Sequence, residues 1–346
     1  MTKRERNFVE ELLQIEGADT YKAKNFTYLS TGNAALNYAL SGSIYKGIPL
    51  GCLVEVFGAD GSGKSTLAYS LINEALKRNF LAVLIDVEGS FTPFQVLRNR
   101  IVDANRIVFC KYKDLRRVLK FIETLGIKGS EKNVKGLIVW DSYAATRLSE
   151  KEDSGSIAEE VRVMSAALKK FLSIFPQSDI TLLIINQLRE NLRGVSFLTS
   201  YTQPGGWALK HASHLRVELK KASSNSKLTR IVSDEEGRVI TFSVVKSKFY
   251  LPTSTDFILL YRHGIDWEYS LIAEAFRRGI LEFEGGWFSF DGKKYRRVDL
   301  LHALKNDEGM RQTLENMLEP SGVKPEEVEK DEVGECNSKP VDLESG

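Results

Sequence analysis

The sequence predicts an α/β protein with a mostly parallel central sheet, preceded by a short N-terminal helical arm and followed by a small α+β C-terminal domain. Three observations lead to this prediction. Apolar runs of strand length alternate with helix-like stretches from residue 51 to residue 214, which is typical of buried parallel strands between two layers of helices. One strand–helix junction carries a complete glycine-rich loop motif. Of the 346 residues, 42% are hydrophobic and 27% are charged, which fits a folded chain and excludes wholesale disorder.

The expected elements follow one another along the chain. We expect strands at 52–57, 81–86, 107–110, 136–140 and 181–185, and helices at 64–77, about 113–125 and 158–175. After His214 apolar and polar residues alternate, which predicts antiparallel strands at 215–221 and 239–246. A second small unit begins near residue 267, with helices at 270–278 and 298–304 and a hairpin that turns at 291–292.

These elements divide the chain into four segments. They are an N-terminal arm at 1–27 with a helix at 7–15, a core at 28–266, a C-terminal domain at 267–320 and an acidic tail at 321–346. In the tail, eight acidic residues and three lysines give a net charge of −5; because the whole chain carries +2, residues 1–320 carry +7. The tail is expected to be disordered. A basic body suits nucleic acid, with which the tail would compete, and a passive solubilising end is the plainer alternative.

Several classes of protein are excluded by composition. The three cysteines lie far apart, which excludes a disulfide scaffold and a clustered zinc site and favours a reducing compartment. No apolar run approaches the roughly 18 residues of a membrane span. No apolar segment follows the basic N-terminal residues, as it would in a signal peptide. We therefore expect no membrane partner and a cytoplasmic location.

The strongest motif is Gly-Ala-Asp-Gly-Ser-Gly-Lys-Ser at residues 58–65, which matches G-x-x-x-x-G-K-[ST] between a strand and a helix. Glycines allow backbone N–H groups to surround a polyphosphate, and the following helix adds its positive end. Lys64 is expected to reach the terminal phosphates, and the Ser65 hydroxyl is expected to bind Mg²⁺. The nucleotide-binding residues are Gly58, Asp60, Gly61, Ser62, Gly63, Lys64, Ser65 and Thr66.

Two carboxylates follow expected strands. Asp141 ends an apolar run, and because ligands bind at the carboxyl ends of parallel strands, it is a candidate to hold Mg²⁺ through water. Glu88 lies two residues after the strand that ends at Asp86, where it could orient and deprotonate an attacking water. An ordinary loop acid is the alternative for each, and spacing alone does not decide.

Together these motifs resemble RecA-type strand-exchange recombinases, of bacterial or phage type. The resemblance covers roughly residues 28–320 in the family's order, at 29–40, 58–65, 85–88, 139–142, 185–189, 204–210, 245–248 and 286–293. It implies a RecA-like P-loop ATPase core with ATP and Mg²⁺ as cofactors, and it makes the arm at 1–27 an oligomerisation element.

The resemblance also implies catalytic roles. Glu88 would activate water, and Gln187 would sense the γ-phosphate and pass that state to the loop that follows it. Lys246 and Lys248 would reach the ATP held by a neighbouring subunit. A lysine pair on an exposed strand otherwise serves to protect a sheet edge.

Two DNA-binding loops are implied, at about 148–157 and 190–204. The DNA-binding residues expected in and around them are Arg162, Ser165, Lys169, Arg189, Arg193, Gly205, Gly206, Trp207 and Lys210. The first three share one helix face, for which a solvated face is the alternative. Trp207 stands where the family more often has a small polar residue, and it either stacks on a base or packs under the loop. Gln95 stands where the bacterial proteins have a tyrosine that stacks on adenine.

The function that follows is an ATP-dependent recombinase. It would form helical filaments on single-stranded DNA, pair them with homologous double-stranded DNA, and hydrolyse ATP in a DNA-stimulated reaction. The hairpin at 287–297 is a candidate for duplex capture, with a solvated hairpin as the alternative. Single-strand-binding and loader proteins are further expected partners, in a bacterial cell or a phage-infected host. The alternatives are a hexameric RecA-fold helicase or motor and a mediator that binds ATP without turning it over; the residues at 205–210 and 246–248 disfavour the helicase.

Overall fold

The computed structural model describes residues 25–148, 157–190, 201–202 and 206–319. The central sheet of this part has eight strands in the order β12-β11-β10-β3-β7-β6-β4-β5. Their bounds are β3 (Leu53–Gly58), β4 (Leu81–Asp86), β5 (Ile107–Cys110), β6 (Gly136–Asp141), β7 (Ile180–Gln187), β10 (Leu215–Lys221), β11 (Gly237–Ser247) and β12 (Ser254–Leu260). The six strands from β10 to β5 are parallel, and β11 runs antiparallel to both of its neighbours, β10 and β12. The predicted fold class is confirmed.

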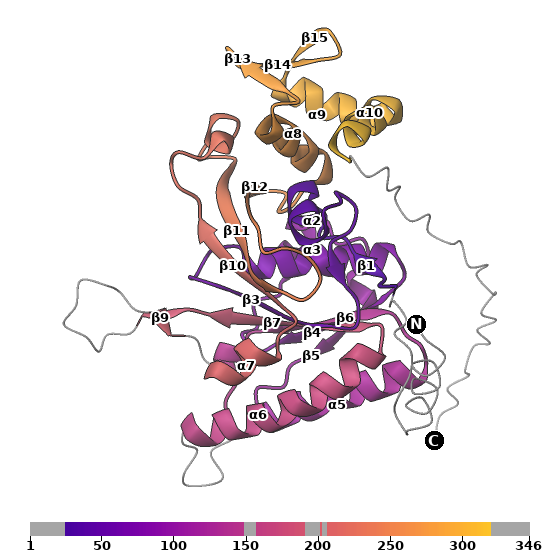
Figure 1. Ribbon diagram of the computed structural model, residues 1–346, viewed down its shortest axis with the longest axis vertical. Helices are drawn as coiled ribbons and strands as arrows, with labels where there is room; N and C mark the ends of the chain where they lie inside the picture. The colour runs from indigo at the N-terminus through magenta and orange to yellow at the C-terminus, as the bar shows by residue number, and fades with distance from the viewer. Residues whose placement is uncertain (1–24, 149–156, 191–200, 203–205, 320–346) are drawn as a thin grey trace, which may run out of the picture.

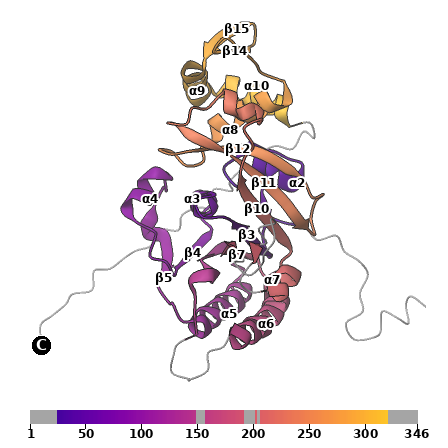
Figure 2. The same ribbon diagram turned by 90° about the vertical axis from the view of Figure 1, so that its left-hand side faces the viewer.

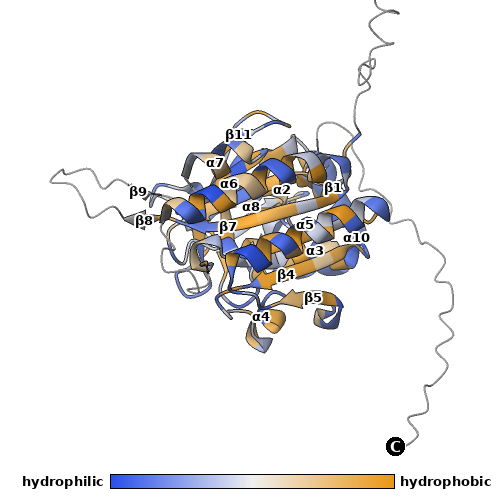
Figure 3. Ribbon diagram, turned by 90° about the horizontal axis from the view of Figure 1, so that it is seen from below, coloured by the Kyte–Doolittle hydropathy of each residue, from blue (hydrophilic) through white to orange (hydrophobic). Residues whose placement is uncertain are grey.

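Helices cover both faces of this sheet (Figure 1). On one face lie α2 (Ala34–Ser41) and α3 (Lys64–Lys77), and on the other lie α5 (Leu115–Glu131) and α6 (Ile157–Ile174). The strands alternate accordingly: Leu84 packs with the α3 side and Ile85 with the α5–α6 side. Figure 3 shows the hydrophobic strand β7 in the space between α5 and α6, with β4 on the other side of α5.

Shorter elements connect the layers. They are β1 (Tyr28–Leu29), β2 (Ile48–Pro49), α4 (Pro93–Arg98), β8 (Arg189–Glu190), β9 (Tyr201–Thr202) and α7 (Gly206–Ala212), with 3₁₀ helices at Ala104–Arg106, Tyr143–Ala145, Phe175–Gln177 and Lys227–Arg230. Side-chain caps fix several helix starts, because an Asx oxygen can accept a backbone N–H that has no partner within the helix. Asn33 caps α2 by accepting from the Leu36 N–H, and Asp114 caps α5 by accepting from the Arg117 N–H.

The C-terminal part forms a small α+β layer at one end of the molecule, next to β11 and β12 (Figure 2). It contains α8 (Trp267–Arg278), β13 (Glu282–Glu284), β14 (Trp287–Phe290), β15 (Lys293–Arg296), α9 (Arg297–Asn306) and α10 (Glu308–Leu318). Its core, which includes Leu271, Phe288 and Leu314, is continuous with Ile258 of β12. The predicted hairpin turn at Asp291–Gly292 joins β14 to β15.

The structure lengthens or adds to the predicted elements. β6 and β7 continue to Asp141 and Gln187, so both polar residues belong to strand ends and not to loops. The sequence prediction did not include β12, α2, α4 or α10. The helix expected at 7–15 and the acidic tail lie outside the described residues, and the four-segment division stays a prediction. Among the described residues, no helix is long and apolar enough to cross a membrane.

Candidate nucleotide site and DNA-facing segments

The phosphate loop joins β3 to α3, and its glycines are required by its shape. Gly61 and Gly63 have φ angles of 68° and 95°, in the left-handed region that favours glycine. A Cβ at Gly58 would lie 2.2 Å from the Leu219 carbonyl oxygen, and one at Gly63 would lie 2.5 Å from Leu259 Cδ1. The loop therefore packs closely against β10 and β12. Where it enters α3, the N-terminus of that helix can receive an anion.

Lys64 is folded over the loop that precedes it. Its Nζ donates hydrogen bonds to the carbonyl oxygens of Gly58 (3.0 Å) and Ala59 (2.8 Å). Burial lowers the pKa of Lys64, while the nearby carboxylates of Asp60, Asp141 and Glu88 act in the opposite direction. The ammonium group is thus held at the loop, where it can neutralise a phosphate.

Asp141 and Ser65, the two expected metal ligands, lie together. The pKa of Asp141 is raised to about 6, mainly by burial and in part by the charges of Glu88 and Asp86, while a hydrogen bond from Ser65 acts in the opposite direction. Asp141 Oδ2 is buried and has no hydrogen-bond partner within the described part of the chain. An unpartnered carboxylate oxygen beside a serine hydroxyl fits Mg²⁺, which prefers hard oxygen ligands and keeps several waters.

Glu88, Gln187 and Ser142 meet at a single oxygen atom. The Ser142 hydroxyl donates to Glu88 Oε1 at 2.5 Å, and Gln187 Nε2 donates to the same oxygen at 3.2 Å. Strand register explains the convergence, because Gln187 lies opposite Gly58 and Asp86 lies opposite Asp141. Two predicted residues are thereby brought together, and Ser142 was missed although it directly follows Asp141.

A cavity of about 230 Å³ lies beside the loop. It is lined by Gly61, Gly63, Lys64, Ser65, Thr66, Tyr69, Ser90, Gln95, Arg98 and Arg238. A larger cavity, about 460 Å³, lies elsewhere, between α3 and the C-terminal layer, and includes none of the predicted nucleotide residues. Residues of the phosphate-loop motif line the smaller cavity, which makes it the candidate nucleotide site. No motif in the sequence indicates that Arg98 and Arg238 belong to this site.

Lys246 and Lys248 lie away from their own phosphate loop. Lys246 Nζ donates to the carbonyl oxygens of Lys210 (2.9 Å) and His211 (2.8 Å) near the end of α7. Burial lowers the pKa of Lys246, and the charges of Lys248 and Arg216 lower it further. Lys248 is exposed just beyond β11. In the described structure Lys246 makes no hydrogen bond to the Glu88 carboxylate.

Comparison with known proteins decides the family. The family model described as the RecA N-terminal domain matches residues 1–266. The chain belongs to the RecA family. It is 34% identical over 300 residues to Protein RecA of Chlorobaculum tepidum, covering 84% of this chain and 82% of that protein. It is 33% identical over 298 residues to Protein RecA of Heliobacterium modesticaldum, with 84% and 82% covered. Protein RecA of Ureaplasma parvum is 31% identical over 334 residues, with 91% and 97% covered.

Membership of the RecA family makes the protein a recombinase of DNA recombination and repair that binds ATP and DNA. The expected resemblance is therefore confirmed. The individual site residues are not tested by the comparisons, and their roles stay predictions.

The expected DNA-facing residues of this RecA-family chain are only partly described. Arg162 and Lys169 are exposed on α6, and Ser165, half-buried between them, donates its hydroxyl to the Val161 carbonyl oxygen. Arg189 belongs to β8 and Gly206 begins α7. Arg193, Gly205 and nearly all of both expected loops lie outside the described residues.

Trp207 is the most exposed aromatic residue among the large hydrophobic residues of the described part of the chain. The residue is 75% exposed, its ring stacks on His211 at 5.8 Å between centroids, and the Lys210 ammonium lies 5.4 Å from the centre of the ring. Such an arrangement can present an aromatic face together with a cation to a base and its phosphate. It favours the first of the two interpretations of Trp207.

Proposed function

We propose that this RecA-family protein is an ATP-dependent recombinase that forms helical filaments on single-stranded DNA and exchanges strands with homologous duplex. The observation that carries the proposal is the position of Gln187. Its side chain bonds to Glu88 at the phosphate site, and its main chain leads within two residues into β8, which opens the second expected DNA loop. A residue in this position can couple the state of the bound nucleotide to the conformation of the second expected DNA loop.

The chemistry proposed for the site is hydrolysis of ATP. The loop from Gly58 to Thr66 would bind the phosphates through its backbone N–H groups and Lys64. Bound Mg²⁺ would supply charge neutralisation on the phosphates, held by Ser65 and, through water, by Asp141. Glu88 would accept the proton of the attacking water, and Gln187 and Ser142 would orient its carboxylate.

Assembly into filaments is supported by two surfaces. Lys246 and Lys248 are proposed to contact the ATP of a neighbouring subunit. The edge strand β5 exposes Val108 and Phe109, and the nearby helix α4 exposes Phe94 and Leu97; an apolar edge strand of this kind is suited to pairing with another subunit. The arm at 1–27 is proposed to take part in the same assembly.

Duplex DNA would be captured in part by the hairpin of β14 and β15. Lys293 and Lys294 are exposed on it, and the Arg296 guanidinium lies 4.1 Å from the centre of the Trp287 ring. The grouping supports contact with a phosphate backbone. Single-strand-binding and loader proteins, and a cytoplasmic location, remain predictions.

Two measurements test the proposal. Electron microscopy with single-stranded DNA and ATP should reveal helical filaments, whereas closed rings would favour the hexameric helicase. An assay of pairing between a labelled single strand and a homologous duplex should then give joint molecules that require ATP. Filaments without pairing would favour the mediator.

A further inference from the structure

The cavity beside the phosphate loop contains two arginines that none of the expected ATP contacts includes. Arg98 ends α4, and Arg238 is the second residue of β11, so they reach the cavity from distant parts of the chain. Both line it together with Gly61, Lys64 and Thr66. They are therefore within the same enclosure as the backbone that is expected to bind phosphates.

Arg238 lies directly against the loop. Its Nη1 is 3.8 Å from the position that a Cβ at Gly61 would occupy. Its strand pairs Arg238 with Leu259, the residue that packs against Gly63. Its Nε is buried and has no hydrogen-bond partner among the described residues. A buried guanidinium N–H without a partner is costly unless a ligand satisfies it.

Arg98 is fixed in place beside Arg238. Its Nε donates to the Tyr261 carbonyl oxygen at 2.8 Å, which orients the guanidinium and leaves its other N–H groups available. Burial lowers the pKa of Arg98, and the neighbouring charge of Arg238 lowers it further. Within the described structure, no carboxylate forms an ion pair with either arginine. Two adjacent cations without a counter-ion make an anion site.

We propose that Arg98 and Arg238 bind the phosphates of the nucleotide within the subunit that supplies the phosphate loop. The inference rests on the proposed function of residues 58–66 as the nucleotide site. Guanidinium groups present planar pairs of donors that match phosphate oxygens, and a bound phosphate would relieve the repulsion between the two arginines. The polyphosphate would then have Lys64 on one side and a pair of arginines on the other. A free subunit would hold its nucleotide before any neighbour contributes Lys246 or Lys248.

The experiment measures binding to free subunits without DNA. Isothermal titration with magnesium-ATP and with inorganic magnesium tripolyphosphate is carried out on wild type, Arg98→Gln, Arg238→Gln and the double variant. The matched control is Arg262→Gln, because Arg262 is exposed on the turn after β12 and does not line the cavity. Unfolding midpoints without ligand show whether each variant is folded. Arg238→Lys provides a second, charge-conserving test.

If the proposal is right, each single variant binds both ligands with an affinity about tenfold lower than that of wild type, which is the usual effect of losing one charge-assisted hydrogen bond. The double variant weakens them further, Arg238→Lys recovers part of the affinity, and Arg262→Gln binds like wild type. A lower affinity for ATP with an unchanged affinity for tripolyphosphate would indicate that the arginines contact the nucleoside and not the phosphates, and it would overturn the proposal. Unchanged binding of both ligands, with Lys64→Ala still impaired, would overturn it while leaving the proposed function intact. A wild type that binds neither ligand would overturn both.

Discussion

Glu88 shows how much of the proposed chemistry depends on a single side chain. Its Oε1 accepts from Ser142 and from Gln187, so the carboxylate is oriented from two strands at once. Asp86 holds the turn beneath it by accepting backbone N–H groups from Gly89, Ser90 and Phe91. The acid is therefore exposed and yet fixed in direction, which is what a group that positions and deprotonates water requires.

The substitution Glu88→Gln should separate binding from hydrolysis. The amide keeps the size of the side chain but cannot accept the proton of water, so hydrolysis should fall by about 10²–10⁴-fold while ATP affinity stays near that of wild type. Release of phosphate and binding of a fluorescent ATP analogue measure the two quantities. Lys64→Ala is the contrasting variant, because it should abolish hydrolysis. Loss of nucleotide binding in Glu88→Gln would make Glu88 a structural residue.

The residues of the site differ in how far the sequence could predict them. The phosphate loop is a contiguous motif whose spacing carries its chemistry, so Lys64 and Ser65 could be named in advance. Ser142 could have been found from its place after Asp141. Arg238 could not, because it reaches the cavity only through the pairing of β11 with β12, and its sequence neighbourhood has no motif.

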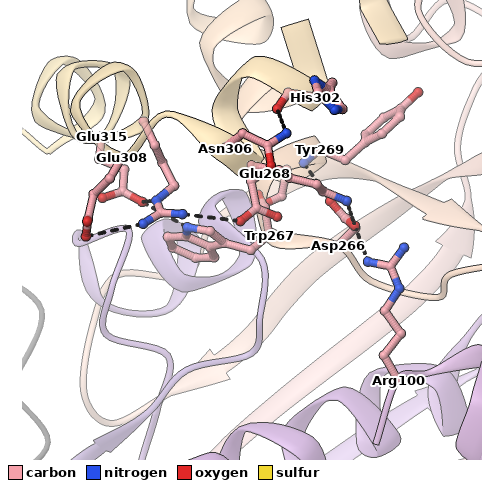
Figure 4. A network of polar contacts seen from close by, with 12 residues as sticks. Arg100, Asp266, Trp267, Glu268, Tyr269, His302, Asn306, Glu308 and Glu315 are labelled. Atoms are coloured by element: carbon pink, nitrogen blue, oxygen red, sulfur yellow. Dashed lines mark hydrogen bonds and ion pairs between the residues drawn. The ribbon is translucent and has the colours of Figure 1, made fainter. Parts of the chain in front are cut away.

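At the scale of elements, the start of α8 is held by a buried acid. Asp266 accepts the Tyr269 N–H as a helix cap and forms ion pairs with Arg100 (2.7 Å) and Lys305 (2.8 Å) (Figure 4). Burial alone would raise the pKa of Asp266, but these hydrogen bonds and charges hold it below its ordinary value. One carboxylate thus links α8 and α9 to the segment that follows α4.

Asp266→Asn should lower the free energy of unfolding by about 1–2 kcal/mol at pH 7, because the amide keeps the cap but loses both charge pairs. The folded-state pKa lies below the unfolded one, so the stabilisation is present above about pH 4 and is lost as the pH falls through the folded value. Urea unfolding of wild type and variant, measured at pH 7 and in steps below pH 4, should show that the difference in their free energies of unfolding becomes smaller as the pH falls. A difference in the free energy of unfolding that does not change with pH would contradict the ion-pair explanation.

The matched control is Glu308→Gln. Glu308 also pairs with an arginine, Arg311 at 3.6 Å, but its side chain is 89% exposed. Water screens such a pair, so its removal should leave the urea midpoint unchanged.

The elements that the sequence missed share a weak local signal. β12 begins with three polar residues, Ser254, Thr255 and Asp256, and it is a strand because it pairs with β11. α10 is rich in polar residues and is fixed by packing of Leu314 and Leu318 on the C-terminal core. α4 could have been predicted, since Thr92-Pro93 is a recognised helix start. Continuous apolar strands such as β4 were placed correctly because burial on both faces leaves an unmistakable run.

For the whole molecule, the proposed assembly makes hydrolysis a property of two subunits. Lys248→Ala should reduce DNA-stimulated hydrolysis strongly and leave ATP binding by free subunits unchanged, because the lysine is proposed to act across the interface. Mixing it with Lys64→Ala subunits should restore part of the activity, since some interfaces then combine an intact Lys64 with an intact Lys248. The rate of phosphate release is measured against the mixing ratio. Mixtures as inactive as their components would argue against action across the interface.

The charge of the tail gives a second prediction at this scale. Residues 321–346 carry −5 and residues 1–320 carry +7, so a tethered anion competes with DNA for the same cations. Deletion of 321–346 should tighten duplex binding severalfold at low ionic strength, and the difference should shrink as salt screens the competition. Fluorescence anisotropy with labelled duplex at two salt concentrations measures it. Equal affinities at low salt would leave the tail with no influence on DNA.

The close packing of the phosphate loop against β10 and β12 has a consequence for the synthesis of the protein. Gly58 and Gly63 fit against the Leu219 carbonyl and the Leu259 side chain, which the ribosome adds long after the loop itself. A nascent chain that ends before β12 has the complete motif. It lacks the Leu259 side chain that contacts Gly63, and it lacks the strand with which Arg238 pairs. We therefore expect the loop to reach its final shape only after β12, which ends at Leu260, has been synthesised, so that nucleotide binding would arise late in translation.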